Sequence, residues 1–469
     1  MKVTESGNLK HRQLRFEDYL QKVSAEQKEY VEVCAPPKMT ETDSTNTNEQ
    51  TEKLVEEILN AENLNRAYKQ VKRNKGAGGI DGMQVDELLP FLREHKDELL
   101  QSLWDGKYRP KPVRRVEILK ENGKMRKLGI PTVVDRLIQQ AVTQELSPIF
   151  EKQFSDNSYG FRPNRSAHDA LRECQRHIAD GYVYVVDMDL EKYFDTVNQS
   201  KLIQILSETI KDGRVISLIY KFLRAGVMVD GLFEESPEGV PQGGPLSPLL
   251  GNIMLNVCDH ELERRGHRFV RYADDMMIFC RSKKAAQRTL DHILPYIEGK
   301  LFLRVNREKT KVAHVKEVKF LGHGFYMHKG EGRLRIHPKS IQKLKDKIRE
   351  MTGRSNGMGI EERKMKLNQI VRGWTNYFKL ADAKSLLRTL DEWLRSRIRM
   401  VTWKRWKRIR TRGENLKKLG IREEQAWMWA NTRKGYWRIA HSQILLIALS
   451  NKRIERAGYL SFNQIYFAK

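Results

Sequence analysis

The stretch that decides the fold reads Phe269-Val270-Arg271-Tyr272-Ala273-Asp274-Asp275-Met276-Met277-Ile278-Phe279. Two short β-prone runs on either side of a tight polar turn predict a hairpin. Its turn would hold two adjacent carboxylates where little else is polar. Adjacent like charges repel, so a buried pair needs a counter-charge, usually a divalent metal ion. A solvated turn is the alternative, and for an isolated Asp-Asp pair it is the commoner one.

A second acidic stretch lies upstream and favours a metal site over a solvated turn. Residues 184–190 read as a buried strand, and Asp187 and Asp189 on it share one face. A strand-borne Asp that faces the hairpin pair could hold two Mg²⁺ ions about 3.5–4 Å apart, the arrangement for in-line nucleotidyl transfer. Magnesium prefers oxygen ligands and keeps waters and substrate phosphates, so few protein carboxylates suffice.

Both stretches, with Pro241-Gln-Gly-Gly-Pro-Leu-Ser-Pro248 between them, resemble the reverse transcriptases. More narrowly, the chain resembles the bacterial group II intron-encoded reverse transcriptase/maturases, from about Glu52 to near its end. The resemblance implies an α+β right-hand polymerase fold. Its fingers and palm would combine an antiparallel sheet with helices, and an α-helical thumb/maturase domain would follow. Many relatives continue into an endonuclease domain, whereas this chain stops at Lys469, so we expect the type without one.

Composition and resemblance together predict four segments. Residues 1–50 are too polar to pack and are expected to be a flexible leader. Residues 51–106 would form an N-terminal extension, 107–334 the fingers and palm, and 335–469 the helical thumb/maturase (X) domain. The expected helices and strands include a helix over 52–71, a hairpin over 114–131, helices over 135–150, 246–262 and 284–300, and a strand pair over 319–325 that closes the palm.

The charge of the chain points to a polyanion as partner. The formal net charge is +26 and the pI is about 9.8. Most of the excess falls in residues 335–469, which hold 33 Lys+Arg against 11 Asp+Glu and seven of the eight tryptophans. Nucleic acid is the expected partner rather than a membrane, because no apolar run is long enough to span one. We expect a cytoplasmic bacterial protein associated with the nucleoid, and the four scattered cysteines to be ordinary thiols.

The catalytic residues follow from the resemblance. Chemistry alone leaves Asp187 and Asp189 open, but the family places an aromatic five residues after the metal-binding Asp, and Phe194 has that spacing from Asp189. Lys309 matches a position where a lysine protonates the leaving pyrophosphate, with Lys311 as an open alternative. The expected catalytic residues are Asp189, Asp274, Asp275 and Lys309. The expected ligands of two Mg²⁺ ions, which Mn²⁺ can replace, are Asp189, Leu190, Asp274 and Asp275.

The resemblance also implies a binding site for the incoming nucleotide. Lys120 and Arg126 flank the turn of the 114–131 hairpin and would grip the triphosphate, although two solvated strand cations are the alternative. Phe194 would lie beneath the sugar and exclude a 2′-hydroxyl, unless it is a core residue. Gln242 would hydrogen-bond the nucleotide or template, and its glycine neighbours equally suit a tight turn.

Three basic groups are candidates for nucleic-acid binding. A glycine-rich loop follows the first, Arg162 and Arg165 are equally compatible with structural ion pairs, and the last is interleaved with tryptophans that could stack on bases. A solvated face is the alternative for the last group. The candidates are Lys72, Arg73, Lys75, Arg162, Arg165, Lys404, Arg405, Lys407 and Arg408.

Three functions are compatible with these features. The first is an RNA-directed DNA polymerase that binds its intron RNA, assists splicing and copies the intron by target-primed reverse transcription. The second is a splicing-only maturase, and the third is a reverse transcriptase of repair or defence. For the first, the expected partners are intron RNA, an RNA template with a DNA or RNA primer, dNTPs and target DNA. The sequence does not predict the oligomeric state.

Overall fold

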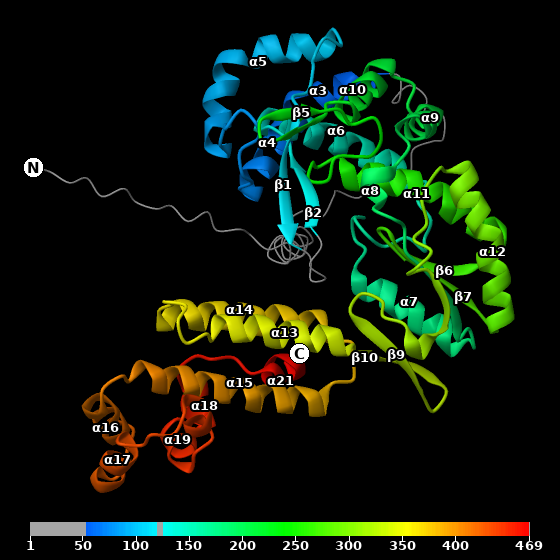
Figure 1. Cartoon of the computed structure of the whole chain (residues 1–469). Coiled ribbons are helices and arrows are strands. Elements are labelled where there is room, and N and C mark those ends of the chain that lie inside the picture. The colour runs from blue at the N-terminus through cyan, green and yellow to red at the C-terminus, as the bar shows by residue number, and fades with distance from the viewer. Residues whose placement is uncertain (1–52, 120–124, 469) are drawn as a thin grey trace, which may run out of the picture. The chain divides into compact units, whose positions relative to one another are not determined.

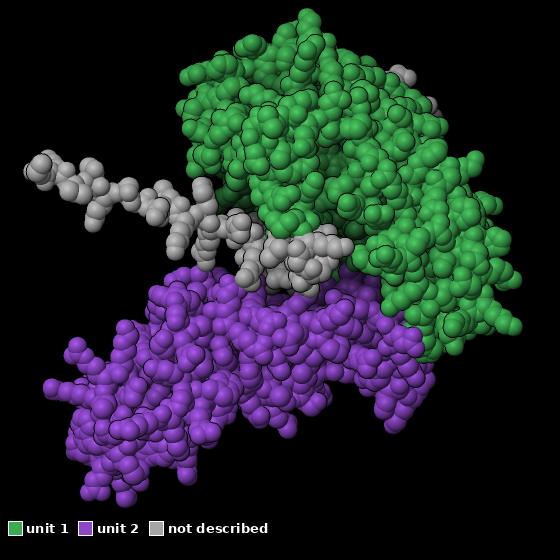
Figure 2. All heavy atoms as spheres, in the orientation of Figure 1, with its two compact units in different colours: residues 1–177, 181–314 green, residues 178–180, 315–469 purple. Residues whose placement is uncertain are grey.

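The computed structural model describes residues 53–119 and 125–468. The chain divides into two compact units, which Figure 2 shows in different colours. Unit 1 comprises Met1–His177 and Gly181–His314, and unit 2 comprises Ile178–Asp180 and Val315–Lys469. Lys120 and the predicted hairpin turn at 121–123 lie outside the described residues, as does the segment expected to be a flexible leader.

Unit 1 begins with helices that pack on α6 (Val133–Glu151). The single helix predicted over 52–71 is two helices, because Asn60 interrupts it. The Asn60 side chain accepts a hydrogen bond from the Glu62 amide at 2.8 Å and so caps the second helix. The elements are α3 (Leu54–Leu59), α4 (Ala61–Asn74), η1 (Val85–Glu87) and α5 (Leu88–Trp104).

The predicted hairpin over 114–131 is confirmed. Strand β1 (Val113–Leu119) pairs antiparallel with β2 (Met125–Ile130), and Ile118 lies opposite Arg126. Strand β1 also pairs in parallel with β4 (Val227–Val229), which forms a short hairpin with β5 (Leu232–Glu234). The sheet order is β2-β1-β4-β5.

A second sheet contains both acidic stretches. Its order is β6-β7-β3-β8, and every neighbouring pair is antiparallel. Its members are β3 (Tyr184–Met188), β6 (Arg268–Tyr272), β7 (Asp275–Cys280) and β8 (Lys311–His314). The central strand β7 carries a continuous buried apolar run after Asp275, and its neighbour β3 is apolar apart from Tyr184 and Asp187. Both the predicted strand over 184–190 and the predicted Asp-Asp hairpin are therefore confirmed.

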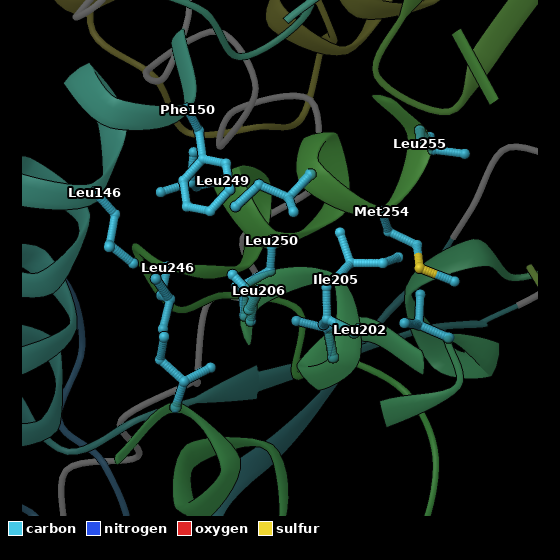
Figure 3. Packing of buried hydrophobic residues seen from close by; sticks show 14 of the residues in the cluster. Leu146, Phe150, Leu202, Ile205, Leu206, Leu246, Leu249, Leu250, Met254 and Leu255 are labelled. Carbon is cyan, nitrogen blue, oxygen red and sulfur yellow. The ribbon is translucent and has the colours of Figure 1, made fainter. Parts of the chain in front are cut away.

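Helices pack on this sheet, and the helices predicted over 135–150, 246–262 and 284–300 are confirmed within a few residues. Helix α12 packs on β3, β7 and β8, and Figure 1 shows it beside β6 and β7; α11 packs on α6, α9 and β6. Figure 3 shows leucines of α11 facing those of α9 and α6, with Leu250, Leu206 and Leu146 among them. The helices between residues 167 and 300 are α7 (Ala167–Ala179), α8 (Tyr193–Thr196), α9 (Gln199–Thr209), α10 (Gly213–Leu223), α11 (Ser247–Arg264) and α12 (Lys283–Lys300).

Unit 2 is helical, as predicted, apart from one hairpin. The prediction that a strand pair over 319–325 closes the palm is wrong. Strand β9 (His323–His328) instead pairs with β10 (Glu331–Ile336) in a separate sheet of two strands. Unit 2 accordingly starts at Val315 and contains this hairpin, whereas the sequence placed a boundary at 335. Its other elements are η2 (Val315–Glu317), α13 (Pro338–Met351), α14 (Ile360–Tyr377), α15 (Lys384–Arg405), α16 (Ile409–Lys418), α17 (Glu423–Ala430), α18 (Tyr436–Ala440), α19 (Gln443–Ala448), α20 (Asn451–Arg456) and α21 (Phe462–Phe467).

Among the described helices of both units, none has the length and apolar character needed to cross a membrane.

Candidate active site at the end of the palm sheet

Three carboxylates gather at one end of the β6-β7-β3-β8 sheet. Asp274 lies in the turn between β6 and β7. Ala273, which precedes it in this turn, has a positive φ of 57°, a conformation uncommon for a non-glycine residue. In the β3–β7 register Met188 lies opposite Met276. Continuing that register past the end of β3 brings Asp189 opposite Asp275, so both acidic stretches end together.

Burial and mutual repulsion act on these carboxyl groups. Asp274 is exposed as a residue, yet nearby protein atoms desolvate its carboxyl group and raise its pKa, and the charge of Asp189 adds to the rise. The guanidinium groups of Arg126 and Arg271 oppose it. Desolvation likewise raises the pKa of Asp187 to about 6, against the charge of Lys311. Such coupled, partly desolvated acids favour a bound cation.

The sequence left open whether Lys309 or Lys311 acts at the site, and the two lysines lie beside different aspartates. Lys309 Nζ lies 3.1 Å and 3.0 Å from the two carboxylate oxygens of Asp189. Lys311, on β8, is the register partner of Asp187. Because the Lys309 side chain is 63% exposed, it can leave Asp189 when a cation takes its place.

The Leu190 carbonyl is oriented toward the hairpin turn. Leu190 bridges Val305, while the flanking hydrogen bonds run from Asn306 N to Asp189 O and from Glu191 N to Arg304 O. In an antiparallel pair with this pattern, the central residue directs its own N–H and C=O to the opposite side. That side is the one on which β3 pairs with β7, so the Leu190 carbonyl faces the end of the β6–β7 hairpin.

These oxygens suit magnesium better than a softer metal. Within the described residues, no three His, Cys, Asp or Glu side chains form a cluster able to hold a metal ion. A magnesium site needs no such cage, because one or two carboxylates, substrate phosphates and waters complete the octahedron. Asp189, Asp274 and the Leu190 carbonyl provide hard oxygen donors, and Asp275 lies beside them, exposed at the start of β7.

Two predicted nucleotide-binding residues contact each other. Arg126 Nε donates to Gln242 Oε1 at 3.0 Å, and the Gly129 amide donates to the Gln242 carbonyl at 2.7 Å. Gly243 is required here: its φ is +128°, and a Cβ would lie 2.4 Å from the Gly129 carbonyl oxygen. Burial lowers the pKa of Arg126, and the charges of Asp274 and Asp195 oppose this.

The Phe194 side chain lies partly in the core and is partly exposed. It is half-buried, its ring centroid lies 5.1 Å from that of Tyr193, and it packs against the main core. Gly251 of α11 makes room for both rings, since a Cβ there would lie 3.1 Å from Phe194 and 3.3 Å from Tyr193.

A buried ion pair lies under the hairpin turn, and the sequence reasoning missed it. Arg271 is fully buried and contacts Asp259 of α11 at 2.5 Å. Its Nη1 also donates to the Ala273 carbonyl at 3.0 Å and to Asn252 Oδ1 at 2.9 Å. Asn252 in turn donates to the Gly160 carbonyl at 2.8 Å. A signal existed: an Arg in an apolar strand and an Asp in an apolar helix are costly to bury unless they pair.

The segment around Gly160 supports the same turn. The Tyr159 amide donates to the Arg271 carbonyl at 2.9 Å, and the Arg271 amide donates to the Asn157 carbonyl at 2.9 Å. A Cβ at Gly160 would lie 2.3 Å from the Ala273 nitrogen. The backbone carrying Asp274 is thus held from two sides.

For Arg162 and Arg165 the structure favours the ion-pair alternative. The Arg162 side chain is 3% exposed, contacts Glu151 at 2.7 Å and donates to the carbonyls of Ser155 and Ser158. Arg165 contacts Asp156 at 2.5 Å. By contrast, the residues at the end of α4 are exposed, namely Lys72, Arg73 and Lys75.

In unit 2 the basic stretch around residue 405 is not one helix. Helix α15 ends at Arg405 and α16 starts at Ile409, which leaves Arg405, Lys407 and Arg408 exposed. Lys404 Nζ donates to the Arg354 carbonyl at 2.7 Å. Trp403 is 1% exposed and belongs to the core of this unit, so the expectation that it stacks on bases is wrong.

An antiparallel sheet with carboxylates at one end is the arrangement expected of a polymerase palm, and comparison with known proteins gives the family. The family model "Reverse transcriptase (RNA-dependent DNA polymerase)" matches residues 118–325, and "Group II intron, maturase-specific domain" matches residues 341–420. Protein YkfC of Escherichia coli is 36% identical over 313 residues, 58% of this chain and 82% of that protein. The group II intron-encoded protein LtrA of Lactococcus lactis is 33% identical over 360 residues, 61% of this chain and 60% of LtrA. The chain belongs to the group II intron-encoded reverse transcriptase/maturase family.

Proposed function

We propose that this protein is an RNA-directed DNA polymerase that also binds the RNA of its intron, assists its splicing and copies it by target-primed reverse transcription. One observation carries the polymerase assignment. Asp189, Asp274, Lys309, Arg126 and Gln242 come from separate segments, and hydrogen bonds or charge coupling join them at one end of the palm sheet.

Each residue has a distinct role in this proposal. Asp189, Asp274, Asp275 and the Leu190 carbonyl hold two Mg²⁺ ions, for which Mn²⁺ can substitute. When bound, these ions activate the 3′-hydroxyl of the primer and stabilise the leaving pyrophosphate. Lys309 leaves Asp189 and donates a proton to the pyrophosphate.

The remaining residues orient the nucleotide. Arg126 binds the triphosphate in a geometry fixed by Gln242, since a guanidinium held by a hydrogen bond keeps its fork aligned. Lys120 would assist it. Phe194 excludes the 2′-hydroxyl of a ribonucleotide by its ring.

Nucleic-acid binding is assigned to the exposed cations. Arg405, Lys407 and Arg408 of unit 2, with the α4 end of unit 1, would contact the backbone of intron RNA, of the primer and template, and of target DNA. The match to a maturase-specific model over 341–420 supports an intron partner over a role in repair or defence. A splicing-only maturase is disfavoured, because Asp189, Asp274 and Lys309 are all present and are linked by a hydrogen bond or by charge.

Two assays on one preparation test this proposal. The first measures Mg²⁺-dependent extension of a DNA or RNA primer on an RNA template with dNTPs, and the second measures splicing of a group II intron RNA at limiting Mg²⁺. Extension that stops on chelation, together with faster splicing, is expected. Splicing assistance without extension would instead establish the splicing-only function.

A further inference from the structure

Unit 2 contains a cavity of about 320 Å³ that lies outside the proposed polymerase site. Its volume is at the lower end of small-molecule sites, about 300–1,000 Å³. Helix α18 packs beside α15 at this place, as Figure 1 shows. None of the lining residues is acidic; they are Thr352, Gly353, Arg354, Arg397, Met400 and Trp437.

Among the residues that the structure describes, neither arginine of this cavity has a carboxylate within ion-pair distance. Arg397 donates to Thr352 Oγ1 at 2.8 Å and to the carbonyls of Arg349 and Thr352 at 3.2 Å and 3.3 Å. Burial lowers the pKa of Arg397, and the charges of Arg349 and Arg354 lower it further. Lys404 adds a cation through its bond to the Arg354 carbonyl. An anion in the cavity would relieve this repulsion.

Aromatic rings lie beside these cations. The Arg354 guanidinium lies 5.5 Å and Lys404 Nζ 6.0 Å from the ring centroid of Tyr436. Trp437 is 43% exposed; the Arg397 guanidinium lies 5.9 Å and the His441 ring centroid 4.6 Å from its ring centroid. The exposed part of this indole, in a cavity that Arg354 and Arg397 also line, offers a surface on which a base can stack.

We propose that this cavity binds one unpaired nucleotide of a single-stranded polynucleotide, with its base on Trp437 and its phosphate between Arg354 and Arg397. A phosphate site alone would need the arginines but would leave the exposed indole unused. A base-paired nucleotide does not fit the role, because its faces are covered by its neighbours in the duplex. The inference rests on the proposed function only in taking nucleic acid as the partner.

Stacking and charge can be removed separately. Binding of a short unstructured RNA strand, of the same sequence as DNA, and of the RNA annealed to its complement is measured by fluorescence anisotropy over a salt series. Trp437→Leu should weaken single-strand binding at least about fivefold and leave the salt slope unchanged. Arg354→Gln should reduce the slope by about 0.7. Neither substitution should change duplex binding more than about twofold.

Two variants serve as matched controls. Trp104 of unit 1 is 44% exposed and is also covered by an arginine, so Trp104→Leu removes a similar indole elsewhere. Arg410→Gln removes one exposed charge from the same unit. Both should bind the single strand as the wild type does.

Cross-linking locates the contact directly. A strand with one 5-iodouracil base, in RNA and in DNA form, should cross-link on irradiation to the peptide that contains Trp437. Equal cross-linking yields with RNA and DNA mean that a base and a phosphate suffice for binding. A higher yield with RNA than with DNA assigns the site to RNA. Cross-links only to other peptides, or an equal loss of single-strand and duplex affinity in Trp437→Leu, would overturn the inference. Failure of primer extension by the wild type would instead refute the polymerase proposal and leave these outcomes interpretable.

Discussion

At the scale of single residues, the site depends on a few groups with different tasks. Asp274 and Asp189 are close enough to raise one pKa by the charge of the other, and Lys309 lies against Asp189. Phe194 has no such charge and acts, in our proposal, only by its shape. The two kinds of residue therefore give different experimental signatures.

Asp274→Asn should reduce primer extension by about three orders of magnitude. It preserves the shape of the side chain but weakens a metal ligand that serves the transition state by several kcal/mol. RNA affinity should stay within about twofold, because little binding surface changes. Steady-state extension and RNA titration measure both. Asp291→Asn on the exposed face of α12 is the control, and near wild-type extension by Asp274→Asn would refute the ligand assignment.

Phe194→Ala should admit ribonucleotides, because loss of the ring opens space for a 2′-hydroxyl. The ratio of kcat/KM for a dNTP to that for its rNTP should fall by roughly tenfold or more. Single-nucleotide incorporation measures the ratio. Phe233→Ala removes an exposed phenylalanine from the β4–β5 hairpin and should leave it unchanged. An unaltered ratio in an active Phe194→Ala enzyme would assign Phe194 to the core alone.

At the scale of elements, the β6–β7 turn is held by groups remote in sequence. Helix α11 supplies Asp259 and Asn252, and the segment before α7 supplies Gly160. The backbone of the turn is therefore fixed before any substrate binds. Preorganisation of this kind matters because a misplacement of about 1 Å at a reacting centre can cost about 100-fold in rate.

Gly160→Ala should lower kcat for primer extension at least about tenfold. The new Cβ would lie 2.3 Å from the Ala273 nitrogen, so the turn that carries Asp274 must move. Single-turnover extension gives the rate, and thermal unfolding shows that the protein still folds. Gly213→Ala, at the first turn of α10 with nothing within 4 Å, is the matched control. Equal activity of both variants would exclude a positioning role for Gly160.

Local sequence patterns predicted most helices and strands, but not which of their residues contact one another in the fold. The Asp-Asp hairpin and the 184–190 strand followed from apolar β-prone runs and turn chemistry. The helices expected over 135–150, 246–262 and 284–300 lie close to the bounds of α6, α11 and α12. Convergence of Arg126 with Gln242 was expected only from resemblance, since they are 116 residues apart. The Arg271–Asp259 pair depends on tertiary packing, which periodicity does not encode. The β9–β10 hairpin is local, and its signal was the turn at Lys329 and Gly330, both of which have a positive φ. For Trp403, aromatic and basic composition alone could not separate a core face from an exposed one.

At the scale of the whole molecule, charge is unevenly distributed along the chain. Residues 335–469 hold 33 Lys+Arg against 11 Asp+Glu. Some of these cations are already engaged within unit 2 and are largely buried, as Arg363 and Arg399 are. Cations of this kind cannot contact a phosphate backbone, so the surface to be tested is smaller than the charge count suggests.

Neutralising Lys404, Arg405, Lys407 and Arg408 together should weaken RNA binding and flatten its salt dependence. Each lost phosphate contact lowers the slope of log K against log salt by about 0.7 to 0.9. Lys404 is engaged with Arg354, so the triple variant that keeps it should show most of the effect. Short-primer extension should suffer less than splicing assistance. Changing Lys283, Lys284 and Arg288 on α12 of unit 1 to Gln matches the triple variant's charge loss, and an equal slope in both would mean a solvated face.

The pair of Arg271 and Asp259 also constrains how this protein can evolve. Both side chains have no exposed surface, so replacing either alone leaves an uncompensated buried charge at a cost of about 3–5 kcal/mol. That is a large share of the about 5–15 kcal/mol by which a domain is stable. A lineage could exchange the pair for apolar residues only by crossing a poorly folded intermediate or by acquiring both mutations together. We therefore expect the two codons to change jointly or not at all, and random mutagenesis to recover neither single replacement among active clones.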